Sequence, residues 1–199
     1  MKIKLMLIIT AIAFLSVSAS AQKEMLTKQE TINYINKKIK ESEGLWYFSP
    51  SYKKNLVQES IKFSGNEDGT VQIDSTRSTK TEANCKESTN VTYRFKPDTI
   101  ASIELDDDPS DKSSRGIITV RLIGKTARVT SERYGPTQIN NNTGECFNYK
   151  TTTDSVNGST VDDPWVSFLK TDPTNLEKLR KAFLHLRDLA KAEDDPFGN

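Results

Sequence analysis

The stretch TDPTNLEKLRKAFLHLRDLAKA, residues 171–192, decides the fold of this chain. Its large apolar residues recur at spacings of three and four, which places them on one stripe of an α-helix. Asp172 is a suitable N-cap with Pro173 in the first turn, and Asp194 and Asp195 oppose the negative end of the helix dipole. Such a helix must dock on an apolar surface to be stable. The residues expected to face that surface are Leu176, Leu179, Phe183, Leu186 and Leu189.

The first residues have the order of a secretory signal peptide. Lys2 and Lys4 precede an apolar run over residues 5–15, and Ala19-Ser20-Ala21 follows. We expect cleavage between Ala21 and Gln22, so that residues 22–199 form one α+β domain of an exported protein, periplasmic or secreted. The apolar run is short for a bilayer span, and we expect no membrane span in the mature chain.

Charge and cysteine content narrow the function classes. The 199 residues carry 28 Lys and Arg against 27 Asp and Glu, and this balance speaks against a nucleic-acid partner. Cys85 and Cys146 are the two cysteines, and export into an oxidising compartment favours a disulfide between them over two free thiols.

A short amphipathic helix is predicted after the leader. Thr27 and Glu30 have the spacing of a capping box, and Gly44 ends the segment. The apolar residues at helical spacing are Ile32, Ile35 and Ile39.

The apolar run Leu45, Trp46, Tyr47 and Phe48 follows this helix directly. It is a candidate interaction patch for a sugar, a lipid or a partner protein. The alternative, which we favour, is that the run packs the first helix onto the sheet, because short apolar runs usually belong to the core.

The middle of the chain has the alternation of β-strands. Val91, Tyr93 and Phe95 alternate with polar residues, and the turn at residues 65–69 separates two other strands. About seven strands joined by short polar turns predict an antiparallel arrangement. We therefore expect a curled antiparallel sheet or partly open barrel, covered by the C-terminal helix. Residues 165–169 are either an eighth strand or a connector into that helix.

The chain offers few residues for catalysis or cofactors. His185 is the one histidine, and no nucleophile motif accompanies it, so an exposed helical histidine is the favoured interpretation. The acidic run from Asp106 to Asp111 lacks the glycine and the closing glutamate of an EF-hand loop, and a solvated hairpin tip is favoured over a calcium site. We expect no catalytic residue, no metal site and no cofactor.

Three segments match an acceptor motif for O-glycosylation, which is Asp followed by Ser or Thr and then by an apolar residue or Thr. This pattern is O-glycosylated in some Bacteroidota. The matches are Asp74-Ser75-Thr76, Asp98-Thr99-Ile100 and Asp154-Ser155-Val156, of which about one is expected by chance in a chain rich in these residues.

The two ends of the chain carry a resemblance. The leader ends Ser20-Ala21-Gln22, and the C-terminal segment contains the core Lys181-Ala182-Phe183-x-His185-Leu186. The combination resembles small exported, mostly uncharacterised proteins of Bacteroidota and implies location and architecture, with no activity. Strands followed by one helix are also similar to pleckstrin-homology-like barrels. The phosphoinositide-binding use of that fold needs a basic first loop, whereas residues 64–70 are acidic.

These observations favour an exported, non-catalytic binding or interaction protein whose partner is not identified. The alternative is a carrier of a small ligand, with the barrel interior or the region of Trp46 and Trp165 as the pocket. A hydrolase with acidic catalytic residues ranks last. A large cavity inside the sheet would favour the carrier, and a filled interior with an exposed apolar patch would favour the interaction protein.

Overall fold

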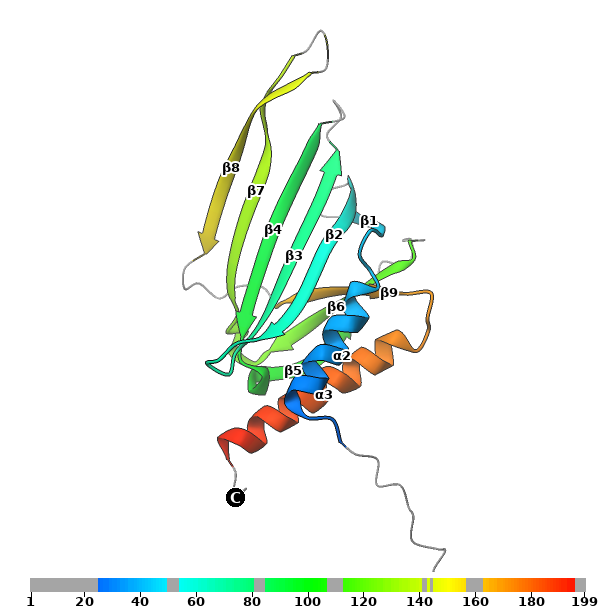
Figure 1. Ribbon diagram of the computed structural model, residues 1–199, viewed down its shortest axis with the longest axis vertical. Coiled ribbons are helices and arrows are strands. Elements are labelled where there is room, and N and C mark those ends of the chain that lie inside the picture. Colours follow the sequence, from blue (N-terminus) through cyan, green and yellow to red (C-terminus); the bar gives the residue numbers. More distant parts are fainter. Residues whose placement is uncertain are drawn as a thin grey trace, which may run out of the picture.

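The computed structural model describes residues 25–49, 54–80, 85–106, 113–140, 143, 145–156 and 163–195. Within these ranges the strands form a six-stranded sheet in the order β1-β2-β3-β4-β7-β8 and a three-stranded sheet in the order β5-β6-β9 (Figure 1). Every pairing is antiparallel, and neither sheet closes into a barrel. The α+β class and the open antiparallel architecture are confirmed, although the strands divide between two sheets.

In the part of the chain that the structure describes, two α-helices and two short 3-10 helices accompany the strands. The helices are α2 (Lys28–Lys40), α3 (Asn175–Asp194), η1 (Pro97–Thr99) and η2 (Ile123–Lys125). The strands are β1 (Trp46–Ser49), β2 (Lys54–Gly65), β3 (Val71–Lys80), β4 (Lys86–Phe95), β5 (Ile100–Leu105), β6 (Arg115–Leu122), β7 (Arg128–Ile139), β8 (Cys146–Val156) and β9 (Trp165–Leu169). The segment at residues 165–169 is therefore a strand, and β1 is a strand that the sequence did not predict.

Helix α2 begins with the predicted capping box. The Thr27 N–H donates to Glu30 Oε2 at 2.8 Å, and the Glu30 N–H donates to Thr27 Oγ1 at 3.3 Å. These hydrogen bonds to Thr27 hold the pKa of Glu30 below its usual value. The helix ends at Lys40, and a turn leads to Gly44, whose φ of 77° a glycine adopts without strain.

Helix α3 begins two residues later than the sequence predicts from Pro173. Asn175 is its first residue, and the carboxylate of Asp172 instead accepts the Thr174 N–H at 2.9 Å in the preceding turn. Hydrogen bonds from Thr174 lower the pKa of Asp172 to about 2. Asp172 therefore stabilises the turn before the helix and does not cap the helix itself, because its side chain accepts from a local backbone donor before the helix starts. The helix ends at Asp194, as predicted.

The apolar stripe of α3 is buried along most of its length. Leu179, Phe183 and Leu186 are fully buried, and Leu176 is half-buried against the core. Leu189 is also half-buried, but it does not belong to the core cluster. The prediction that Leu189 packs against the sheet is therefore wrong. Ala182 and Ala190, which have the same helical spacing, are also buried.

One hydrophobic core lies between the large sheet, the small sheet and the two helices. Strands β2, β3 and β4 each contribute buried side chains from the face that points toward the helices, which we call the inner face. Phe63 of β2 meets Phe183 of α3 edge to face, with ring centroids 5.5 Å apart. Both sheets and both helices contribute side chains to this one core.

The chain leaves the large sheet after β4. Pro97 is buried at the start of η1, and β5 then begins the small sheet. Prediction from successive hairpins places the next strand beside β4, but that position is taken by β7. The missing N–H of Pro97 cannot continue a ladder, and this fits the departure of the chain at that residue.

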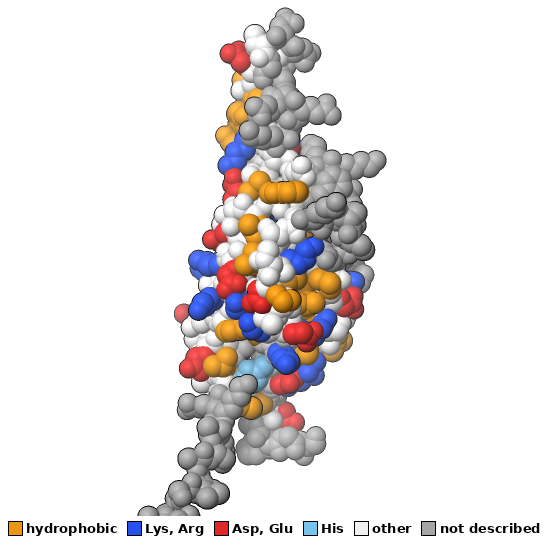
Figure 2. Space-filling view, turned by 90° about the vertical axis from the view of Figure 1, so that its right-hand side faces the viewer, with side chains coloured by type: hydrophobic (Ala, Val, Ile, Leu, Met, Phe, Trp, Pro, Cys, Tyr) orange, Lys and Arg blue, Asp and Glu red, His pale blue; other side chains and the backbone are white. Residues whose placement is uncertain are grey.

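The upper end of the large sheet projects beyond the core. Figure 1 shows β7 and β8 extending past the body that contains the helices, and Figure 2 shows the molecule narrowing at the same end. We call this projecting part the blade. At its tip Cys85 and Cys146 form a disulfide with Cα atoms 5.9 Å apart, which confirms the predicted pairing.

Candidate binding face

The large sheet has a second face, which points away from the core. Side chains along a strand alternate between faces, so the buried Val91, Tyr93 and Phe95 belong to the inner face. Thr92 and Arg94 lie between them and point to the other face, which we call the outer face, and both are half-buried. The outer face is therefore the broad surface of this sheet that reaches solvent.

Three aromatic side chains form an exposed cluster on the blade. Tyr134, Phe147 and Tyr149 are 47%, 42% and 40% exposed, and we call them the aromatic patch. The rings of Tyr134 and Tyr149 stack with centroids 5.2 Å apart and planes 20° from parallel. Tyr134 pairs with Thr151 and Tyr149 with Pro136, so the two tyrosines are diagonal cross-strand neighbours on one face.

A polar groove of about 320 Å³ lies beside this patch on the outer face. Asp74 is its best-connected residue, because it accepts from the Thr92 hydroxyl at 2.8 Å and from the Gln72 amide at 2.9 Å. Hydroxyl, amide and carboxylate groups thus line the middle of the outer face. The groove is also lined by Ser75, Thr76, Asn90, Val91, Thr130 and Glu132.

The residues of the apolar run 45–48 differ in their exposure to solvent. Trp46 is 52% exposed, whereas Tyr47 is 3% exposed and Leu45 is half-buried. The side chain of Phe48 lies outside the described residues. Since β1 places Trp46 and Tyr47 on opposite faces, the described part of this run presents one exposed aromatic side chain at the edge of the sheet.

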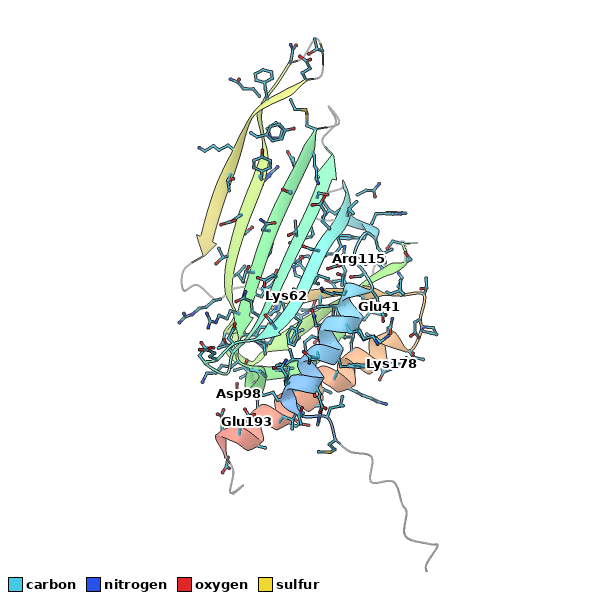
Figure 3. All side chains as sticks on the ribbon, viewed as in Figure 1. Glu41, Lys62, Asp98, Arg115, Lys178 and Glu193 are labelled. Atoms are coloured by element: carbon cyan, nitrogen blue, oxygen red, sulfur yellow. A yellow bond between two sulfur atoms is a disulfide. The ribbon has the colours of Figure 1, made fainter. Side chains whose placement is uncertain are left out.

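Arg115 is a buried arginine that sequence reasoning missed. Its guanidinium carbon lies 3.6 Å from the ring centroid of Tyr47, and its Nη2 donates to Gln58 Oε1 at 3.0 Å. The Ser167 hydroxyl donates to the same oxygen at 3.3 Å. Figure 3 shows Arg115 where β1, β2 and β9 come together. This cluster joins the two sheets through polar contacts, and its burial gives a ligand no access.

His185 of α3 contacts the backbone of the segment that precedes α2. Its Nε2 lies 2.8 Å from the carbonyl oxygen of Leu26, so it ties the segment before α2 to α3. Among the described residues, no three His, Cys, Asp or Glu side chains come together as a metal site. Residues 107–112, which include most of the acidic run Asp106–Asp111, lie outside the described residues.

The three modification matches have different settings. Ser75 is buried at 3% exposure beside Gln58, so its hydroxyl is closed to an enzyme in the folded protein. Thr99 is half-buried, and its hydroxyl donates to the Lys96 carbonyl at 2.6 Å. The side chains of Asp154, Ser155 and Val156 lie outside the described residues.

Comparisons with protein-family models, curated proteins and solved structures show no match to this chain. None of the helices in the described residues has the length and apolar character to cross a membrane. The assignment of a role therefore depends on the surfaces of the molecule itself.

Proposed function

We propose that this chain is an exported, non-catalytic interaction protein that binds a partner protein through the aromatic patch on its blade. The observation that carries the proposal is the exposure of Tyr134, Phe147 and Tyr149 together on one face of the sheet. Tyrosine is enriched in the energetically dominant parts of protein interfaces, because a large ring brings contact area and its hydroxyl still satisfies polar partners.

The blade holds this patch in a fixed arrangement. The patch strands β7 and β8 pair over most of their length, and the disulfide ties the start of β8 to the segment before β4. A surface whose side chains are already ordered loses less conformational entropy when it binds. The same disulfide supports export, because such bonds persist in oxidising compartments. We also propose export on the basis of the signal-peptide pattern of the leader and the resemblance to exported proteins of Bacteroidota.

The space between the two sheets favours the interaction protein over the carrier. It is occupied by side chains of both sheets, including Phe63 at 2%, Val120 at 0% and Phe168 at 3% exposure. A small-ligand carrier needs an apolar pocket of several hundred cubic ångströms at this position. The burial of these side chains supports recognition at the surface of the molecule, which is where the aromatic patch lies.

The aromatic patch should be required for retention of the partner. We expect the Tyr134→Ser/Tyr149→Ser protein, immobilised on a resin, to lose a protein that the parent chain retains from the exported fraction. Removing two central aromatic side chains typically weakens an interface by roughly 2 kcal/mol or more each. The readout is quantitative mass spectrometry of the retained proteins.

A control variant separates the patch from exposed aromatic residues in general. Trp46→Ser removes an equally exposed ring at the opposite edge of the large sheet and should retain the partner. Equal retention by the tyrosine variant and the parent chain would exclude the patch as the binding surface.

A further inference from the structure

A second groove lies on the outer face, at the opposite end of the sheet from the blade. It has a volume of about 460 Å³ and lies between the β2–β3 turn, the end of β4, η1 and the start of β7. Three cations and three hydroxyl-bearing residues line it. These residues are Arg94, Lys96, Arg128, Thr70, Thr99 and Thr126.

Two of the cations face each other across neighbouring strands. Arg94 of β4 pairs directly with Arg128 of β7, so both side chains rise from the same face. Like charges directly opposite in an antiparallel pair repel each other. Lys96 follows Arg94 by two residues and adds a third positive charge to the groove. The fold thus concentrates positive charge at this place, although the net charge of the whole chain is only +1.

The carboxylate of the groove neutralises one of these charges. Asp68 Oδ2 accepts from Arg94 Nη2 at 2.7 Å, and Arg94 Nε donates to the Thr70 hydroxyl at 2.9 Å. Hydrogen bonds from Thr70 and the nearby Arg94 keep the pKa of Asp68 below its usual value, so it is ionised at neutral pH. Within the described part of the chain, Lys96 and Arg128 make no ion pair.

We propose that this groove binds the phosphate or sulfate group of a small ligand, with Arg128 and Lys96 as the principal cations and Arg94 as a fixed third. A guanidinium presents its N–H donors in a fork that matches two oxygens of a tetrahedral anion, and an ammonium adds a point charge. An anion between Arg94 and Arg128 relieves their mutual repulsion. The groove is separate from the aromatic patch, and its occupation does not depend on the partner protein.

Arg128→Gln is the discriminating variant, because it removes an unpaired charge from an exposed position. Titration with inorganic phosphate, sulfate and glucose 6-phosphate, followed by NMR or calorimetry, should show saturable binding to the parent chain. We expect Arg128→Gln and Lys96→Gln each to weaken that binding about tenfold. Arg133→Gln is the matched control, since Arg133 lies on the same strand but is ion-paired with Glu87 at 2.9 Å, and it should bind like the parent chain.

Thermal unfolding gives a second readout that separates binding from folding. Phosphate should raise the Tm of the parent chain and of Arg133→Gln by the same amount, and at the same phosphate concentration it should raise the Tm of Arg128→Gln clearly less. In phosphate-free buffer Arg128→Gln should be at least as stable as the parent chain, because the cross-strand repulsion is gone.

Vesicles containing phosphatidylglycerol distinguish a lipid headgroup from a soluble ester. Binding to vesicles alone, lost in Arg128→Gln, would support the groove and assign the anion to a lipid. Binding of soluble esters, lost in the same variant, would support it with a soluble ligand. Absence of saturable binding in every arm, or binding that Arg128→Gln and Lys96→Gln both leave unchanged, would overturn the proposal.

Discussion

We expect a chain that ends before Asp172 not to fold, because it lacks the helix that covers the core. Leu179, Phe183 and Leu186 of α3 are fully buried. At roughly 1.5–3 kcal/mol for each side chain, their burial contributes about 5–9 kcal/mol, which is comparable with the net stability of a whole domain. We expect the truncated protein to show no cooperative thermal transition and to lose its near-ultraviolet circular dichroism.

Two point variants test the same contact in the full chain. Phe183→Ala should lower the free energy of unfolding by about 3–5 kcal/mol, because it removes a buried ring that packs on Phe63. Lys181→Ala, on the exposed side of the same helix, should change it by less than about 0.5 kcal/mol. The measurement is chemical denaturation of both variants. Similar midpoints would show that the stripe is not buried in the monomer, and α3 would then be a docking element.

Loss of the disulfide should have the second largest effect. The bond joins residues 61 apart in the sequence, and the chain-entropy relation gives a contribution of about 4 kcal/mol for a loop of that size. We expect Cys85→Ser/Cys146→Ser to unfold at a correspondingly lower denaturant concentration. Hydrogen exchange should accelerate most in β8, which is an edge strand of the large sheet tied down by this bond.

The parent chain in reducing buffer is the control for the serine side chains, and it should behave like the double variant. Unchanged midpoints and unchanged exchange in β8 would mean that pairing with β7 alone holds the blade. In that case the pairing of β8 with β7, and not the disulfide, would hold the side chains of the aromatic patch in place.

Local signals predicted the parts of the fold that local interactions determine. The Thr27–Glu30 capping box is complete within one turn, and the stripe of α3 is readable from its period. The disulfide was predictable from composition and compartment, because the chain has only two cysteines. In each case the decisive residues are near in sequence or leave no alternative partner.

The division into two sheets and the buried arginine depend on contacts that are distant in sequence. In the sequence, Arg115 follows a polar run and has the appearance of an exposed charged residue. In the structure it is buried, because Tyr47 and Gln58 contact its guanidinium. Likewise, nothing within β4 reveals that its second neighbour in the sheet is β7, which begins at Arg128, long after β4 has ended at Phe95. The outer-face grooves follow from this pairing, so they could not be predicted before it was known.

Site-specific photocrosslinking tests the binding face most directly. A benzophenone side chain is placed at position 149 in the aromatic patch or, as the control, at position 181 on the exposed side of α3, in cells that export the protein. We predict a discrete adduct with one partner protein from position 149 and no such adduct from position 181. An adduct from position 181 with none from position 149 would contradict the account, because the partner would then bind the helix and not the blade.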